Sequence, residues 1–452
     1  MPGMPRSRTA PPTMHAARKS KPRPKEQVTN NSLPYEETPH LSGIGERAFT
    51  VLILLMSTGA FMCLVTVTGQ QPDEPGILGK LVTGSIYLII FLLLSRCVDF
   101  WKTIWQVRWV IGLASFAVLS VFWSEDPSES FRKGISVFAT ALFGLYFASR
   151  YSLSDQIRLL ARMCGISMVC SLVFGLLGLG QSVDGAMGWF GIYVQKNGLG
   201  RMALLSALVF WCLAKIDARV RWAAWTGVLL SLVLIYLSNS MTAMIGLALL
   251  IALQVWLRAF RRSKRLGVAL LGLGAVVGVF ALRWALMNMQ IAGGAVGRDL
   301  SMTGRVQVWI FCTFMALQRP WLGYGYYAFW EGMKGPSARI WAALNNGVPH
   351  AHNGVIDLWL ALGLVGVGIF AIGFITYLRR AFSCLDWTSP DSSWPLMYLA
   401  FFVIFNLTES SLLQPNSLFW ALYAATAFSV SAQSESSPLR LTAGGHQIAY
   451  GR

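Results

Sequence analysis

Two of the chain's five histidines, His350 and His352, lie three residues and one residue before Asn353, where a new apolar segment begins. A histidine at a boundary between water and membrane either acts as a general base near neutral pH or is a structural residue of the interface. A His-x-His pair can also bind a metal, but Asp357 is the only carboxylate nearby in the sequence and no cysteine is close. The sequence therefore favours a base over a metal site. Glu409, near the end of a later apolar segment, either orients such a base or marks the end of a helix.

Three arginines upstream are placed where they can bind an anion. Arg201 lies four residues after Asn197, so both share one face of a helix. A guanidinium one turn into an apolar segment either serves a function or extends to the membrane surface. Arg298 and Arg305 lie close together on either side of Asp299, and arginine suits bidentate recognition of phosphate oxygens. Asp299 can instead form a salt bridge with one of the two, which leaves the other for an anion.

The elements that position these residues are predicted to be membrane-spanning helices. The chain is 55% hydrophobic and only 13% charged, whereas soluble proteins carry about 25% charged residues. We therefore predict an all-α integral membrane protein with about twelve transmembrane helices, in a range of roughly eleven to thirteen. The candidate segments are residues 48–68, 77–95, 109–123, 135–149, 159–180, 197–214, 222–238, 240–257, 267–286, 354–377, 395–413 and 416–432.

The formal charge is +17, and the positions of the Lys and Arg residues along the chain indicate the membrane topology. With the N-terminus in the cytoplasm, most of the 37 Lys and Arg residues lie on the cytoplasmic side, as the positive-inside rule requires. This distribution argues against a nucleic-acid-binding surface. We predict a disordered basic cytoplasmic tail at 1–45, a membrane domain at 46–432 and a cytoplasmic tail at 433–452. The seven cysteines imply no disulfide framework.

A large periplasmic loop is predicted at 286–353, between the ninth and tenth transmembrane segments. Within it, residues 306–317 are apolar at helical spacing, and Ser301 or Thr303 is expected to cap this helix. Residues 319–327 form a turn-rich aromatic segment that we expect to lie along the membrane surface. Chemical labelling at Ser337 would test the side on which the loop lies.

The spacing around His352 resembles a known signature. His352 and Asn353, followed after nine residues by 363–366 (Gly-Leu-Val-Gly), are similar to the H-N-x9-G-x-x-G motif of the O-antigen ligase and Wzy-type polymerase superfamily. Upstream pieces agree with it: Lys196-Asn197 with Arg201, residues 238–242 at a helix junction, and Arg305 in the long loop. Residues 123–127, 297–305 and 319–325 are most similar to the ExoQ-like exopolysaccharide polymerases within that superfamily. The resemblance extends from about residue 43 to 432.

The resemblance implies a metal-independent glycosyltransferase of GT-C-type architecture in the bacterial inner membrane, with its active site facing the periplasm. Its donor would be a glycan linked to undecaprenyl diphosphate, and no cofactor or nucleotide would be needed. His352 would be the catalytic base that deprotonates an acceptor hydroxyl. Arg201 and Arg305 would bind the donor diphosphate, together with Lys196, Asn197 and Arg298.

Three functions remain open at this point. In a polymerase, the acceptor is another lipid-linked repeat unit, whereas in a ligase it is a glycan such as the lipid A-core. A transporter of lipid-linked sugars would carry out no chemistry and would place charged residues near the middle of its spans. Few such residues occur here, because the charged residues of the spans gather at the outer face of the membrane. The charges therefore argue against a transporter. The resemblance to the ExoQ-like branch implies a polymerase of exopolysaccharide repeat units, with a ligase as the alternative.

Overall fold

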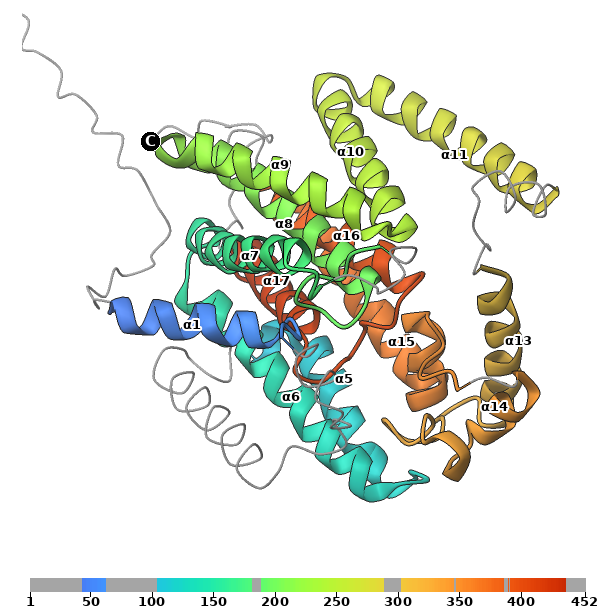
Figure 1. Ribbon diagram of the computed structural model, residues 1–452. Helices are drawn as coiled ribbons and strands as arrows, with labels where there is room; N and C mark the ends of the chain where they lie inside the picture. The colour runs from blue at the N-terminus through green and yellow to red at the C-terminus, as the bar shows by residue number, and fades with distance from the viewer. Residues whose placement is uncertain are drawn as a thin grey trace, which may run out of the picture. The chain divides into compact units, whose positions relative to one another are not determined.

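The computed structural model describes residues 43–61, 104–180, 188–287, 302–344, 347–385, 389 and 391–435, and its regular elements are helices (Figure 1). The α-helices are α1 (Ile44–Met56), α5 (Arg108–Leu119), α6 (Pro127–Arg150), α7 (Leu153–Leu176), α8 (Lys196–Ile216), α9 (Arg221–Ser238), α10 (Met241–Arg262), α11 (Lys264–Met287), α13 (Met302–Gln318), α14 (Ala338–Leu344), α15 (Gly354–Ser383), α16 (Trp394–Asn406) and α17 (Leu418–Glu435). Short 3₁₀ helices occupy Ser120–Phe122, Ala218–Val220 and Gly332–Lys334.

The prediction of a helical membrane protein is confirmed. Within the described ranges, five helices are long and apolar enough to cross a membrane: α7, α8, α9 with the 3₁₀ turn before it, α10 and α15. Two shorter apolar helices, Arg108–Phe122 and Trp394–Asn406, match two further predicted segments. The predicted segment 77–95 lies outside the described residues.

α8 is the most buried of these five helices. It packs along α9 and α7 and also contacts α10, while α17 packs along α6. Aromatic stacking joins α16 to α17, with the rings of Phe402 and Tyr423 5.0 Å apart. Hydrogen bonds from Asn197 to Glu409 and from Arg201 to Ser411 join the start of α8 to the segment between α16 and α17.

The break between α9 and α10 occurs at the predicted junction. Asn239 ends α9 in the left-handed conformation, with φ of 55°, which asparagine tolerates better than most residues. Ser240 then begins α10, and its hydroxyl accepts the backbone N–H of Ala243. Residues 238–242 therefore form a sharp helix junction, as the sequence predicted.

The predicted helix at 395–413 is wrong at its C-terminal end, because α16 stops at Asn406. The Asn406 side chain donates to the carbonyl of Phe402 and accepts the backbone N–H of Ser411. It thereby provides partners that a continued helix would otherwise supply. Residues 407–417 form an irregular segment, with positive φ at Leu413 and Asn416. We call this segment the α16–α17 loop.

The aromatic segment 319–327 packs against a kink in α15, and its position along the membrane surface stays a prediction. Gly363 has φ of 66° within α15, and a Cβ there would meet the carbonyl oxygen of Trp321. The backbone N–H of Leu364 donates instead to the carbonyl of Pro320, 2.8 Å away. The glycine of the sequence motif is therefore needed for close approach of two backbones.

Other predictions concern the long loop. α13 confirms the apolar helix predicted at 306–317, although it begins at Met302, so Thr303 lies inside the helix. Arg298, Asp299 and Ser301 lie outside the described residues. α1 begins at Ile44, inside the predicted tail of 1–45.

Candidate active site

A carboxylate in the α16–α17 loop lies at the centre of the candidate site. Glu409 Oε1 accepts a hydrogen bond of 2.9 Å from Asn197 Nδ2 and another of 3.3 Å from Arg305 Nη2. The second oxygen, Oε2, lies 3.7 Å from Nδ1 of His352. The Glu409 side chain is only 10% exposed. Three residues predicted from separate parts of the sequence therefore meet at one buried carboxylate.

Each partner of Glu409 is fixed by its own helix. Asn197 lies in the first turn of α8, and its Oδ1 accepts the hydroxyl of Ser240 at the start of α10. Arg305 lies in the first turn of α13 and donates from Nη1 to the carbonyl of Thr408 at 2.7 Å. Arg305 therefore contacts both the Glu409 carboxylate and the backbone beside it. It fixes the α16–α17 loop and also neutralises part of the charge of Glu409.

The two histidines lie in a tight turn that ends at the cap of α15. Asn353 caps this helix by accepting the backbone N–H groups of Val355 and Ile356. His352 has φ of 51°, and its backbone N–H donates to Nδ1 of His350 at 3.2 Å. The proton of a neutral His350 ring is therefore on Nε2, which can donate but cannot act as a base.

The ring of His352 is arranged differently from that of His350. Its Nδ1 is buried, faces Glu409 and has no hydrogen-bond partner among the described residues. A carboxylate on this side of the ring can orient the imidazole and stabilise its protonated form. Nε2 is then the nitrogen available to take a proton. Of the two histidines, His352 has the geometry of a general base.

Asp357 holds the histidine turn from the other side. Its carboxylate accepts the backbone N–H of Ala351 at 3.1 and 3.2 Å and the indole N–H of Trp330 at 2.8 Å. It also accepts the hydroxyl of Ser410 in the α16–α17 loop. The sequence offered Asp357 only as a metal ligand, but its oxygens bind these donors instead. It therefore connects the histidine turn to two other segments.

The charges in the site are set by mutual contact. Burial by itself raises the pKa of the Glu409 carboxyl, but the nearby His352 ring and the charges of two arginines outweigh it, so the pKa lies below its ordinary value. Burial, followed by the neighbouring His352 ring, lowers the pKa of His350 to about 4. Near neutral pH, Glu409 is therefore an anion and His350 is neutral.

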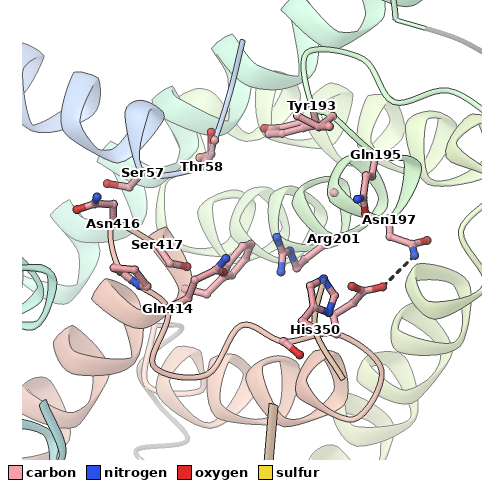
Figure 2. A pocket seen from close by; sticks show the side chains of 17 residues that line it. Ser57, Thr58, Tyr193, Gln195, Asn197, Arg201, His350, Gln414, Asn416 and Ser417 are labelled. Atoms are coloured by element: carbon pink, nitrogen blue, oxygen red, sulfur yellow. Dashed lines mark hydrogen bonds between the residues drawn. The ribbon is translucent and has the colours of Figure 1, made fainter. Parts of the chain in front are cut away.

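A cavity of about 370 Å³ opens beside this cluster, between the end of α1, the start of α8 and the α16–α17 loop (Figure 2). Arg201 and His350 both extend into it in Figure 2. The guanidinium of Arg201 lies 4.2 Å from the ring centre of Phe419, and its Nη1 donates to the hydroxyl of Ser411. Its Nε is buried without a hydrogen-bond partner among the described residues. The guanidinium of Arg201 therefore gives the cavity a cationic group that can bind an anionic ligand.

The rest of the cavity wall is rich in side chains that can form hydrogen bonds to the oxygen atoms of a ligand. Amides and hydroxyls make up much of it, and they are Ser57, Thr58, Gln195, Asn197, Gln414, Asn416 and Ser417. The Arg201 guanidinium and the Glu409 carboxylate also line it, so the cavity is polar and Arg201 supplies its positive charge. The donors of this lining, the Arg201 guanidinium among them, can bind the oxygens of a phosphate or diphosphate group.

The predicted anion-binding residues are not all in this cavity. Asn197 and Arg201 line it, whereas Arg305 is bonded to Glu409 and Thr408 and does not. Lys196, the first residue of α8, is half-buried but is not part of the lining. His350 was expected to be secondary, yet it lines the cavity. Its position depends on the α15 cap and the α16–α17 loop, which no local sequence pattern reports.

A metal ion remains a geometric alternative. Donor atoms of His350, His352 and Glu409 lie within 4.8 Å of one another, and such residues are common metal ligands. Arg305 already occupies one oxygen of this carboxylate, and Arg201 lies in the adjacent cavity. Two guanidinium groups oppose a second cation at short range. Arg305 therefore competes with a metal ion for this carboxylate, and the metal-independent reaction stays a prediction.

Comparison with known proteins places this chain near one family of membrane proteins. Residues 226–371 match the family described as O-Antigen ligase, a range that contains Arg305, His352 and Gly363. The predicted resemblance to the O-antigen ligase and Wzy-type superfamily is confirmed. The chain is also 26% identical over 279 residues to the exopolysaccharide production protein ExoQ of Rhizobium meliloti (strain 1021), covering 59% of this chain. The match spans 63% of the length of that relative. Within the O-antigen ligase match, the histidine turn and kinked α15 are the elements that carry the motif.

Proposed function

We propose that this protein is a glycosyltransferase that polymerises undecaprenyl-diphosphate-linked oligosaccharide repeat units in exopolysaccharide biosynthesis. The observation that carries the proposal is the pairing of His352 with the buried Glu409 beside the Arg201 cavity. This arrangement supplies a base and an anion-binding group in one place. The similarity to ExoQ supports the exopolysaccharide branch.

The donor diphosphate is proposed to occupy the cavity lined by Arg201. The guanidinium of Arg201 would donate to a phosphate oxygen, and the surrounding amides and hydroxyls would bind the remaining oxygens. Positive charge at this position also stabilises the leaving group as negative charge develops on it. Lys196 and Arg298 stay predicted donor-binding residues, at the start of α8 and outside the described ranges.

The transfer step requires one proton acceptor. His352 Nε2 takes the proton of an acceptor hydroxyl, whose oxygen forms a bond to the anomeric carbon of the donor sugar. The bond from that carbon to the phosphate oxygen breaks, and undecaprenyl diphosphate leaves with the electron pair, with inversion at the carbon. Glu409 stabilises the imidazolium that results, while Asn197 and Arg305 hold the carboxylate in place. The step uses no metal, cofactor or nucleotide.

Two other functions, ligation and transport, account for fewer of these observations than polymerisation does. A ligase would carry out this chemistry with a lipid A-core acceptor, and the O-Antigen ligase match supports it as the second candidate. A transporter of lipid-linked sugars would need the anion-binding cavity but not the His352–Glu409 pair. The pair therefore favours catalysis over transport alone.

A reconstituted assay tests the proposed function directly. Purified protein in lipid nanodiscs is given the lipid-linked repeat unit of the producing bacterium, without nucleotide. We expect glycan chains of increasing length and equivalent release of undecaprenyl diphosphate. Transfer that occurs only after lipid A-core is added would indicate the ligase. Movement of intact donor across a liposome membrane without new glycosidic bonds would indicate the transporter.

The proposed periplasmic site also predicts a topology, with both termini in the cytoplasm and residues 286–353 outside. Ser337 proves unsuitable for labelling, because it is fully buried and its hydroxyl donates to Gly332. Met333, four residues earlier, is 67% exposed. A cysteine introduced as Met333→Cys is expected to react with an impermeant maleimide in intact spheroplasts, above the level of the parent protein. Labelling that needs a permeabilised inner membrane would place the site on the cytoplasmic side.

A further inference from the structure

A second cavity lies on the other side of His350. It has a volume of about 210 Å³. His350, Ser410 and Gln414 line both this cavity and the one that contains Arg201. The two cavities are therefore separated by a thin wall made from the histidine turn and the α16–α17 loop. A group bound in each would approach the other at this wall.

The lining of the second cavity differs from that of the first. Aromatic side chains dominate it, including Tyr327 and Trp330, and among the described residues no lysine or arginine lines it. Its polar groups are those of His350, Asp357 and Gln414, with the hydroxyl of Ser410. A diphosphate would find no positively charged lining residue here. An acyl chain would cover the polar groups of His350 and Gln414 without offering them a hydrogen bond. Flat aromatic faces with a few hydrogen-bonding groups suit a sugar ring, which has apolar C–H faces and polar edges.

We propose that this second cavity binds the acceptor sugar, an inference that rests on the proposed glycosyl transfer. A donor held by Arg201 and an acceptor beside Tyr327 would meet at the wall formed by the histidine turn. The volume is below the range of about 300–1,000 Å³ that is usual for drug-sized ligands. The cavity therefore takes the terminal sugar of an acceptor glycan, with the rest of the chain outside.

Tyr327 is the residue on which this site depends most directly. It has φ of 65°, which is uncommon for an aromatic residue and persists only where the surroundings fix the backbone. Its ring lies 5.1 Å from that of Tyr326 and 5.2 Å from Nζ of Lys133. The side chain remains 38% exposed. The Tyr327 ring is therefore fixed in position and still accessible, as stacking on a sugar requires. Trp330, by contrast, is bonded to Asp357 through its indole N–H and supports the histidine turn as well.

The test measures acceptor and donor separately. Nanodisc-embedded protein receives a fixed concentration of lipid-linked repeat unit and a varied concentration of the same oligosaccharide freed from its lipid. Binding of sugar-free undecaprenyl diphosphate is measured in parallel. Tyr327→Ala is expected to raise the half-saturating acceptor concentration about tenfold, with unchanged affinity for undecaprenyl diphosphate. Tyr327→Phe, which keeps the ring, should remain close to wild type.

Trp321→Ala is the matched control. Trp321 is an aromatic residue of the same segment, 67% exposed, and it lines neither cavity. Its removal should alter neither measurement. Unchanged acceptor saturation in Tyr327→Ala would overturn the acceptor site, and so would an equal loss of acceptor and undecaprenyl diphosphate affinity. Failure of the proposed function appears differently, as wild-type protein that binds undecaprenyl diphosphate but forms no product at any acceptor concentration.

Discussion

His352→Ala is expected to lower the rate of polymer formation by about 10²- to 10⁴-fold, the usual contribution of a general base. The affinity for undecaprenyl diphosphate should stay near the wild-type value, because Arg201 and not His352 faces the donor cavity. The physical reason is the position of Nδ1 against Glu409, which leaves Nε2 to accept the proton. Single-turnover measurements with saturating donor in nanodiscs would report the chemical step.

His350→Ala provides the comparison for this variant. It removes the acceptor for the backbone N–H of His352, a loss of about 0.5–1.5 kcal/mol that corresponds to roughly a tenfold effect or less. EDTA should leave the wild-type rate unchanged. A metal bound by both histidines and Glu409 would behave differently, since both variants would lose activity to the same extent and EDTA would inhibit. Rapid turnover by His352→Ala would remove this residue from the catalytic centre.

Arg201→Ala is expected to weaken binding of undecaprenyl diphosphate by about 10- to 100-fold, as removal of a charge-assisted hydrogen bond does. Its guanidinium lines the cavity, and its charge also helps to keep Glu409 ionised. Arg201→Lys should restore binding only in part, because an ammonium group retains the charge but not the planar set of donors. Direct binding to nanodisc-embedded protein measures this effect without reference to turnover.

Variants of two other arginines show whether a loss of donor binding is specific to Arg201. Arg319 pairs with Glu125 at an exposed position outside both cavities, so Arg319→Ala should bind donor normally. Arg305 contacts Glu409 instead of the cavity, so Arg305→Ala should lower turnover more than donor affinity. Normal donor binding in Arg201→Ala would exclude the diphosphate site proposed here. A loss in Arg305→Ala confined to donor binding would show that Arg305 leaves Glu409 when the donor binds.

Much of the fold could be predicted from local composition. Apolar segments such as 159–180 and 197–214 became α7 and α8, because a backbone in lipid satisfies its polar groups most readily as a helix. The spacing from His352 to Gly363 also had local causes. Asn353 caps the helix that follows, and Gly363 permits the backbone contact at its kink.

The composition of the site depended on contacts that the sequence does not report. Glu409 follows an apolar segment whose helix ends at Asn406, because that side chain bonds to its own backbone and to Ser411. Only the resulting loop brings Glu409 to His352, Asn197 and Arg305. Asp357 and His350 likewise acquire their positions from partners distant in the chain. Local patterns determine which segments are helices, since each helix forms its hydrogen bonds within itself, whereas the pairing of buried charges is decided by how the helices pack.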